Sequence, residues 1–467
     1  MQEQTEGTST RGYLSYGFGI EDIEGVGSGT LYNFQGELYS VTAALVKIAQ
    51  DHTETTIGNL PSVGGEGAPF VADNGETLAI VFPGGYSYFY DTENGIVQIT
   101  DPAFQAYEGE EGGVRGVVRV SGVFVFWTKS TLFSGSIATD NKGQDFDALD
   151  FVEPFLDDDI QRGINLRDEL YVFGNDRCRP YGVAVTGSFP FAEIGGAGFD
   201  KGLASPYAIQ RFDNSLVFVG GGQNEQSNVW RVLGAGAVSK ISTPFIDSKI
   251  ADLINPEEWH YSTSSFAFNF DGHFYFGFTF GSILTGETYV YDATSSAIKG
   301  RHMWHRRKYG ALADDITPWT VTSITEAYGK FYTSDYYGGL GRIDKDIYTE
   351  YGVTPEREFS GYYLANQRRP VFIDRVELIC ESGVGKEWLN RHMVGRTPEI
   401  ELWISDDGGR TFNSAGSRQL GVFQDYTART VWDALGYSEQ GRLFKFTCSA
   451  PVKQVFLKLL ATLEEGN

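Results

Sequence analysis

The sequence predicts an all-β protein: a β-propeller of about seven blades over residues 30–356, then a small β-sandwich or strands that close the ring over residues 357–467. Composition is the first observation behind this prediction. The 467 residues include 58 Gly, 34 Phe and 26 Tyr but only 3 Met. Aromatic residues favour strands and glycine favours tight turns. A propeller can also take several hundred residues as one unit.

A recurring hairpin is the second observation. An apolar strand, a short turn and a second strand that opens on apolar or aromatic residues recur along the chain, with turns at Gly36, Gly75, Gly122, Asp168, Asn214, Gly272 and Gly329. Successive turns are about 40 to 58 residues apart, close to the period of a four-stranded blade. An irregular β-sandwich remains an alternative, because hairpins at intervals are common in β proteins.

Second hairpins lie between these turns, at residues 86–100 and 228–242 and from residue 288 onward. In the last of them, Asp292, Thr294, Ser295 and Ser296 predict a polar turn, because short polar side chains bond to nearby backbone. Two hairpins per period make a four-stranded blade, which buries both of its faces against neighbouring blades.

Three segments depart from the repeat. Residues 1–29 are interpreted as an N-terminal arm. A helix is predicted from the N-cap Thr243 and Pro244 onward, with Ile246, Ile250, Leu253 and Ile254 on one face. Beyond residue 357 the strands become longer and more regular, which is the third observation behind the predicted fold.

The charge and the cysteines exclude several functions. The formal net charge of −24 repels phosphate backbones, so ordinary nucleic-acid binding by the isolated chain is not expected. Cys178, Cys380 and Cys448 are too few and too scattered for a disulfide framework or a zinc site. We expect free, buried thiols, no metal and no cofactor. No signal peptide and no apolar run of membrane-spanning length is recognisable, which suggests a protein made in a reducing cytoplasm.

The segment "SDDGGRTF" fits the Asp-box hairpin turn of sialidases and related propellers, with Ser405, Asp407, Gly409 and Phe412 at its defining positions. Asp407 is expected to accept backbone N–H groups, Gly409 to permit the tight geometry and Phe412 to anchor the turn in the core. The turn is a folding device. A sialidase would also need three converging arginines and a tyrosine nucleophile, and the sequence identifies no such set.

The segment "RHMWHRRK" is the one dense basic cluster that the sequence shows. Its charged or titratable members are Arg301, His302, His305, Arg306, Arg307 and Lys308. Two histidines three residues apart could hold a metal on a helix, but these flank Trp304 in a strand-like segment. A solvated loop is one interpretation, and a patch that docks an acidic neighbour is the other. The carboxylates around residues 138–147 and 156–160 lack calcium-loop spacing and are interpreted as solvated loops.

Several weak motifs occur in one order that resembles a known family. They are a "VTG…PF…GA…KG" run over residues 185–202, then "NVWRVLGAG", "KISTPFID" and "VYDATSSA…W". The opening "GYLSYGFGIEDIEG" and the "WISDDGG" turn extend the likeness over most of the chain. The sequence resembles the packaged-DNA stabilisation or tail-hub (nozzle) proteins of short-tailed double-stranded DNA phages.

The resemblance implies a structural protein of the virion tail, assembled in the host cytoplasm, without catalytic activity. It implies a homo-oligomeric ring, a hexamer, that seals the packaged genome and forms part of the DNA ejection channel. Its partners would be the portal or adaptor ring, the tail needle or tip, and tail fibres or tailspikes. Genomic DNA would pass without specific binding, and no membrane would be engaged. The alternative is a glycan-acting propeller, either a sialidase-like hydrolase or a lectin.

Overall fold

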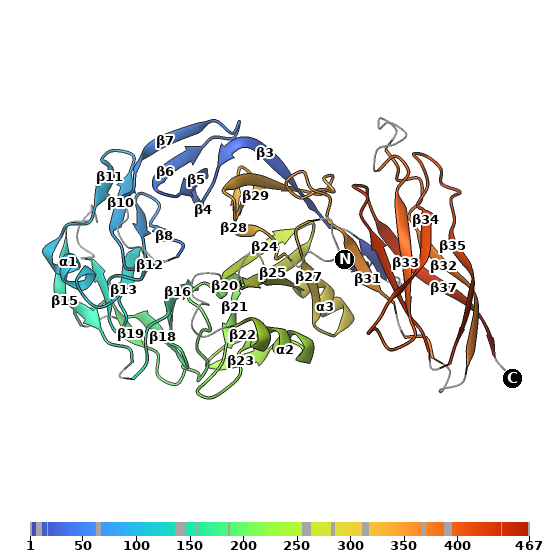
Figure 1. Cartoon of the computed structure of the whole chain (residues 1–467). Coiled ribbons are helices and arrows are strands. Elements are labelled where there is room, and N and C mark those ends of the chain that lie inside the picture. Colours follow the sequence, from blue (N-terminus) through green and yellow to red (C-terminus); the bar gives the residue numbers. More distant parts are fainter. Residues whose placement is uncertain are drawn as a thin grey trace. The chain divides into compact units, whose positions relative to one another are not determined.

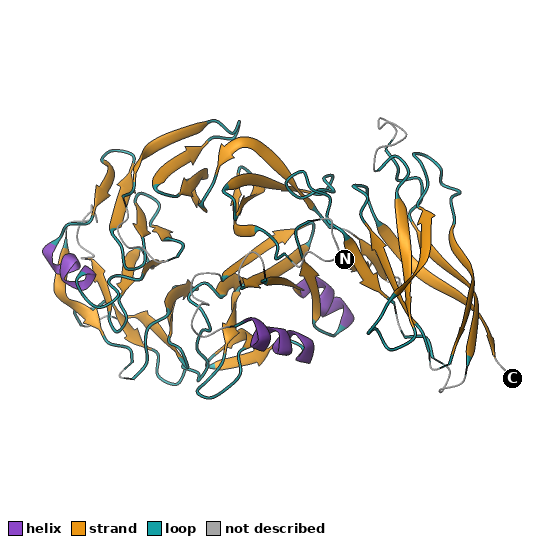
Figure 2. Ribbon diagram, viewed as in Figure 1, coloured by secondary structure: helices purple, strands orange, loops and turns teal. Residues whose placement is uncertain are grey.

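The computed structural model describes residues 2–5, 12–15, 17–61, 67–135, 145–155, 157–184, 187–254, 263–281, 285–310, 317–361, 363–365, 370–386, 395–439 and 441–465. Strands dominate these residues, with three short helices among them (Figure 2). The chain divides into two compact units. Residues 23–293 and 318–342 form the propeller unit, and residues 1–22, 294–317 and 343–467 form the sandwich unit.

Seven four-stranded sheets of consecutive hairpins lie around a common centre (Figure 1) and are numbered here as blades 1 to 7. Blades 1 to 3 consist of β4 (Thr30–Phe34), β5 (Glu37–Val41), β6 (Ala44–Ile48) and β7 (Glu54–Asn59); β8 (Phe70–Asp73), β9 (Leu78–Val81), β10 (Ser87–Asp91) and β11 (Gly95–Gln98); and β12 (Gly116–Val120), β13 (Val123–Trp127), β14 (Leu132–Gly135) and β15 (Phe146–Val152).

Blades 4 to 6 consist of β16 (Arg162–Leu166), β17 (Glu169–Phe173), β18 (Cys178–Val183) and β19 (Phe191–Glu193); β20 (Ile209–Phe212), β21 (Ser215–Gly220), β22 (Asn228–Gly234) and β23 (Ala237–Lys240); and β24 (Ser264–Phe270), β25 (His273–Phe280), β26 (Glu287–Asp292) and β27 (Met303–Arg307). Blade 7 has the order β28 (Val321–Ala327), β29 (Lys330–Asp335), β30 (Gly339–Asp344) and β3 (Gly19–Gly27). The predicted all-β propeller is confirmed.

The first two strands of each blade are joined by the predicted hairpin turns. In blade 1, Phe34 pairs with Glu37, so only Gln35 and Gly36 turn the chain, with φ of 55° and 83°. Two positive φ values are typical of the type I′ turn, whose twist matches that of the strands. Blades 3 to 7 repeat this geometry, whereas blade 2 has a four-residue loop between Asp73 and Leu78.

The N-terminal residues do not form the predicted arm. β3 is the outermost strand of blade 7, and β1 (Gln2–Thr5) and β2 (Gly12–Ser15) belong to a sheet of the sandwich. Without β3, the edge of β30 would have unpaired N–H and C=O groups. Such groups cost free energy when they are buried, and they can pair with strands of other chains when they are exposed. The strand that closes the ring therefore comes from the N-terminus rather than from the residues after 357.

The C-terminal strands form the predicted sandwich. One sheet has the order β1-β2-β37-β32-β35 and the other the order β31-β36-β33-β34. The C-terminal members are β31 (Arg357–Ser360), β32 (Val371–Cys380), β33 (Glu399–Ser405), β34 (Asn413–Gln419), β35 (Thr430–Ser438), β36 (Leu443–Cys448) and β37 (Val455–Glu465). Val376, Leu402, Trp432 and Phe446 are fully buried in its core.

The three helices are α1 (Pro102–Glu108), α2 (Pro244–Leu253) and α3 (Ala293–Lys299). The predicted α2 is confirmed, with Thr243 as N-cap and with Ile246 and Ile250 buried. None of the helices in the described part of the chain is long and apolar enough to cross a membrane.

The turn predicted after Asp292 is wrong, because residues 293–299 form α3. Asp292 is buried and hydrogen-bonds to the His273 ring (Oδ2 to Nδ1, 2.8 Å), so it does not turn the chain. Ser296 accepts the backbone N–H of Met303 at 2.8 Å. Gly300, with φ of 63°, follows the helix at the position where a left-handed residue commonly ends one.

The three cysteines form no disulfide. Cys178 and Cys448 are buried and Cys380 is half-buried. Burial raises the pKa of all three thiols, which disfavours the reactive thiolate.

Gly220 of blade 5 lies close to the backbone of the segment that precedes the blade. A Cβ at this position would lie 1.9 Å from the carbonyl oxygen of Gly202, which the backbone pairing of Gly202 with Gly221 holds in place. We expect Gly220→Ala to lower the free energy of unfolding by about 1–3 kcal/mol, the usual cost of overpacking. Urea denaturation measures the change. Gly195→Ala, whose Cβ would meet nothing within 4 Å, is the control. Equal stability of the two variants would contradict this packing.

Candidate functional site: the central cavity of the propeller

The structure divides the predicted basic cluster into exposed residues and more buried residues. Arg301, His302 and Arg306 are exposed. The Arg307 guanidinium forms an ion pair with Glu350 in which the two side chains are only 10% and 3% exposed, and it lies 4.1 Å from the centre of the Phe18 ring. Arg307 is therefore engaged within the fold, and the docking hypothesis is restricted to the exposed residues.

The remaining members of the cluster also have local partners or surroundings. Lys308 lies 3.5 Å from Glu356 (Nζ to Oε1). His305 is half-buried in β27, and burial together with the charge of Arg307 lowers its pKa well below the usual range. Among the described residues, no group of three His, Cys, Asp or Glu side chains is placed to hold a metal ion.

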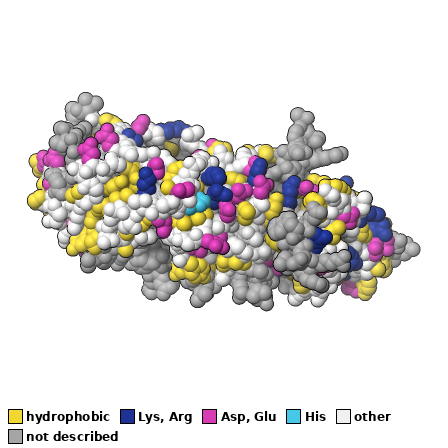
Figure 3. All heavy atoms as spheres, turned by 90° about the horizontal axis from the view of Figure 1, so that it is seen from above, with side chains coloured by type: hydrophobic (Ala, Val, Ile, Leu, Met, Phe, Trp, Pro, Cys, Tyr) yellow, Lys and Arg dark blue, Asp and Glu magenta, His cyan; other side chains and the backbone are white. Residues whose placement is uncertain are grey.

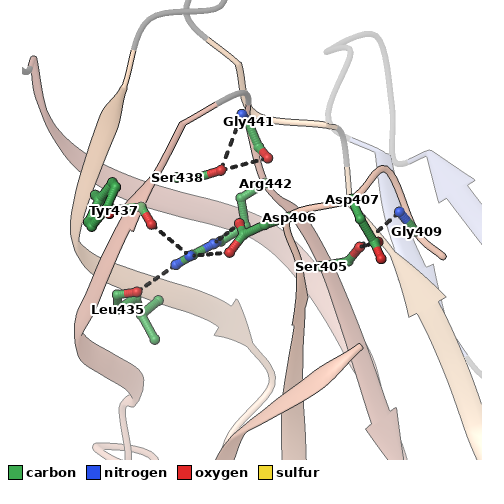
Figure 4. A network of polar contacts seen from close by, with 9 residues as sticks. All are labelled: Ser405, Asp406, Asp407, Gly409, Leu435, Tyr437, Ser438, Gly441 and Arg442. Carbon is green, nitrogen blue, oxygen red and sulfur yellow. Dashed lines mark hydrogen bonds and ion pairs between the residues drawn. The ribbon is translucent and has the colours of Figure 1, made fainter. Parts of the chain in front are cut away.

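The Asp-box segment forms a hairpin turn between β33 and β34, with the hydrogen bonds expected of it (Figure 4). The Ser405 hydroxyl donates to Asp407 Oδ1 at 2.7 Å and accepts the N–H of Gly409 at 2.8 Å. Asp407 also accepts the N–H groups of Arg410 and Thr411 and the Thr411 hydroxyl. Gly409 has φ of 93°, a conformation that glycine adopts without strain.

Phe412 differs from its predicted role as a core anchor. It is half-buried, and the Lys445 ammonium lies 4.4 Å from its ring centre. Beside the turn, Arg442 is 4% exposed and forms a two-pronged bond to Asp406, with Nε to Oδ1 and Nη2 to Oδ2 both at 2.7 Å (Figure 4). These groups hold one another, as a structural turn requires.

The acidic loop around residue 158 is not simply solvated. The Asp158 side chain is 4% exposed and accepts the N–H groups of Asn175 and Asp176, at 3.0 and 3.2 Å. It therefore orders the turn between β17 and β18. Most of the other acidic segment, residues 138–144, lies outside the described residues.

The propeller unit has a central cavity with a volume of about 890 Å³. The first strands of all seven blades, β4, β8, β12, β16, β20, β24 and β28, contribute to its lining. Hydroxyl groups of Ser264, Thr322 and Thr325 and the amide of Gln210 are among the polar groups on the wall. The charged lining residues are Arg119, Arg162, Arg211 and Asp73.

Aromatic side chains connect blades across the centre of the ring. Phe70 of blade 2 stacks on Tyr207, which precedes blade 5, with ring centres 5.4 Å apart. The Tyr207 hydroxyl donates to the carbonyl of Ala68 at 2.9 Å, and the Arg162 guanidinium of blade 4 lies 5.1 Å from the centre of the Phe70 ring. Because blades 2 and 5 are not neighbours in the ring, these contacts can only be made through its interior.

Tyr32 and Asp73 form a second polar pair on the wall. The Tyr32 hydroxyl donates to Asp73 Oδ2 at 2.7 Å. Burial and this bond to a carboxylate raise the pKa of Tyr32 far above its usual value, so the hydroxyl stays neutral and acts as a donor. A neutral phenol of this kind is poorly suited to act as a nucleophile.

Sequence reasoning missed the cavity arginines, although the repeat contained a signal. Aligning the blades on their two-residue turns places Asn33, Arg119, Asn165, Arg211, Asn269 and Glu326 at the same position, two residues before the turn. Two of the asparagines donate to the preceding blade: Asn33 Nδ2 to Glu326 O at 2.6 Å, and Asn165 Nδ2 to Arg119 O at 2.7 Å. Of the six residues at this position, Arg119, Asn165 and Arg211 line the cavity, so the recurring polar position indicated two of the three cavity arginines.

Comparison with known families agrees with this architecture. Residues 1–348 match the family model described as bacteriophage P22 Gp10, beta-propeller, and residues 356–464 match the model described as bacteriophage P22 Gp10, beta-sandwich. The chain belongs to the bacteriophage P22 Gp10 family. The predicted resemblance to the DNA-stabilisation or tail-hub proteins of short-tailed phages is thus confirmed. As a member of the P22 Gp10 family, the chain is a structural protein of a phage tail.

Other comparisons add little to the P22 Gp10 assignment. A search of curated proteins finds no match. Similar solved structures include virginiamycin B lyase from Staphylococcus aureus, at 10% identity over 70% of this chain and 99% of that one, with a TM-score of 0.42. Another is BamB from Moraxella catarrhalis, at 10% identity over 71% of this chain and 100% of that one, with a TM-score of 0.38. Likenesses this distant carry no argument about activity.

The Asp-box turn predicts an acid sensitivity of the sandwich. Hydrogen bonds from the Thr411 hydroxyl and backbone lower the pKa of Asp407, and the bond from Arg442 lowers that of Asp406. A depressed folded-state pKa stabilises the fold above the unfolded value, about 4, and this contribution is lost as the pH falls further. We expect Asp407→Asn to be less stable than wild type at neutral pH and to lose less stability on acidification. Denaturant titrations from about pH 2 to 7 measure this difference.

The control for this experiment is Glu439→Gln, which changes an exposed carboxylate outside the turn. It should follow the wild-type pH profile. An Asp407→Asn variant with the same pH dependence as wild type would show that the turn does not depend on the ionised carboxylate.

Proposed function

We propose that this chain is a tail hub, or nozzle, that seals the packaged genome and forms part of the DNA ejection channel. The observation that carries the proposal is the match of both P22 Gp10 domains, propeller and sandwich, in order along one chain. The working form is a homo-oligomeric ring, a hexamer, assembled in the host cytoplasm. It contacts the portal or adaptor ring, the tail needle or tip, and tail fibres or tailspikes.

In this role the protein acts by shape, assembly and electrostatics rather than by a catalytic step. The candidate motifs favour this interpretation, because their polar groups are used within the fold. Asp407 holds a turn, Arg307 pairs with Glu350, and Asp158 orders a loop. The glycan-acting alternative rested on the Asp-box, which the hairpin geometry explains without a ligand.

The charge is distributed unevenly along the chain. Residues 357–467 contain 14 acidic and 14 basic residues, so the whole formal net charge of −24 belongs to residues 1–356. On the face shown in Figure 3, acidic and basic side chains are interspersed among hydrophobic ones. The propeller-forming part of the chain is therefore the part that repels phosphate.

We infer that propeller surfaces line the ejection channel and keep DNA from adhering to it. Repulsion between like charges is screened beyond about 8 Å at physiological ionic strength, so it acts close to the wall and keeps the duplex centred. A basic wall would instead bind the backbone by releasing counterions. Negative charge multiplied around a ring allows DNA to leave quickly.

A structure of the assembled ring, with its surface potential, tests this inference. We expect an electronegative lumen formed by residues of 1–356, and no measurable binding of duplex DNA to the ring at physiological ionic strength. An electropositive lumen, or tight duplex binding under these conditions, would contradict the proposed channel.

The exposed part of the basic cluster yields a separate prediction about assembly. If Arg301 and Arg306 dock an acidic neighbour, Arg301→Glu combined with Arg306→Glu should impair ring formation, measured by analytical ultracentrifugation, and leave the monomer folded. Exposed substitutions usually change stability by less than about 0.5 kcal/mol. Arg307 is left unchanged, because reversing its charge would place a second carboxylate beside the buried Glu350.

The control for assembly is Arg410→Glu, a charge reversal at an exposed position in the Asp-box turn. It should assemble like wild type. Normal assembly of the double variant would show that the cluster is a solvated segment.

A further inference from the structure

The described lining of the central cavity has a charge opposite to that of the chain. Among the described residues, three guanidinium groups and one carboxylate line the cavity, whereas the whole sequence has a formal net charge of −24. Arg119 lies in β12, Arg162 in β16 and Arg211 in β20, so three consecutive blades supply the positive charges. A positively charged wall in an acidic protein favours the binding of an anion.

The one carboxylate among the described lining residues is already engaged. Asp73 accepts the Tyr32 hydroxyl at 2.7 Å and the N–H of Gly75 at 2.9 Å. Among the described residues, no carboxylate forms an ion pair with Arg119, Arg162 or Arg211. The protein therefore leaves these charges uncompensated in the part of the chain that the structure describes.

Arg162 is held in place but not fully satisfied. Its Nη1 donates to the carbonyl oxygens of Pro206 at 2.9 Å and Ile209 at 3.4 Å, while its Nε is buried without a partner among the described residues. Burial lowers the pKa of Arg162 to about 10 and also lowers that of Arg211. Each neighbouring positive charge acts in the same direction: Arg211 on Arg162, and Arg119 on Arg211.

We propose that the central cavity is a binding site for a small oxyanion, a molecule bearing phosphate or carboxylate groups, held by Arg119, Arg162 and Arg211. Guanidinium groups remain charged at neutral pH and match both oxyanions with paired N–H donors. A fixed, partly desolvated arginine gains more from an anion than a solvated one does.

The rest of the wall suits a small polar molecule. The volume of about 890 Å³ falls within the range of small-molecule sites. The Gln210 amide and the hydroxyls of Ser264 and Thr322 can bond to polar groups of such a ligand. Tyr32 offers aromatic surface, whereas Trp319 and Thr320 are buried behind the wall.

This site is built from residues of one chain, whereas the proposed ejection channel requires a ring of chains. Glu326 occupies the same blade position as Arg119 and Arg211 but is not part of the cavity lining, so it does not neutralise the site. Failure of the anion site would leave the proposed tail-hub role intact, and failure of that role would leave the site intact.

Titration calorimetry of the full chain with pyrophosphate and, separately, with citrate tests the proposal and distinguishes phosphate from carboxylate ligands. We expect saturable binding of at least one anion by wild type. Arg119→Gln combined with Arg211→Gln should raise the Kd at least tenfold. Arg119 and Arg211 both retain solvent-accessible surface at the cavity wall, so the fold should persist. Arg301→Gln combined with Arg410→Gln removes the same charge elsewhere and should bind like wild type.

A thermal-shift measurement keeps the test decisive if calorimetric signals are small. The bound anion should raise the Tm of wild type and of the control variant, but not that of the cavity variant. Absence of saturable binding to wild type would overturn the proposal. Equal weakening in the control variant would do the same, because it would reveal binding by overall charge.

Discussion

The pairing of β3 with β30 is the constraint on which the propeller depends. It places residues from near the start of the chain and from around residue 340 in one sheet, so blade 7 contains both ends of the propeller sequence. A ring left open at this point would expose two sheet faces and a strand edge to water. The central cavity depends on the same pairing, because seven first strands converge on one centre only in a closed ring.

The inner wall combines two uses of one sequence position. At two blades, asparagine joins neighbouring first strands by donating to a backbone carbonyl. At two others, arginine occupies the equivalent position and forms no ion pair with the described residues. The same position of the repeat therefore joins neighbouring blades in two cases and carries a positive charge in two others.

The fold was largely predictable because its signals are local. Two-residue turns such as Asp213-Asn214 and Asp271-Gly272 tolerate positive φ, and strands on both sides carry the pattern of a buried sheet. The roles of β3 and α3 were not predictable in this way. β3 pairs with a strand some three hundred residues away, and α3 begins beside an Asp292 whose side chain is taken by His273. The sequence around β3 does not indicate its pairing with β30, and the sequence around Asp292 does not indicate its bond to His273.

The candidate site was harder to predict than the fold. The Asp-box was visible because Ser405, Asp407 and Gly409 act within five residues of one another. The cavity arginines are about one blade apart, and only ring closure brings them to one wall. For Arg307 the sequence suggested a surface role that the structure does not support. It belongs to a basic run, but its side chain is largely buried in an ion pair with Glu350, more than forty residues away.

The position of β2 limits how this gene can recombine. Leu14 pairs with Phe456 and Ser15 with Val455, so the C-terminal sandwich is completed by a strand encoded far upstream of its other strands. A crossover near residue 356 between two related phages would join one parent's sandwich to the other parent's β1 and β2. Inheritance of the sandwich as an intact module therefore requires two crossovers, one after β2 and one near residue 356, and the two segments should diverge together among relatives.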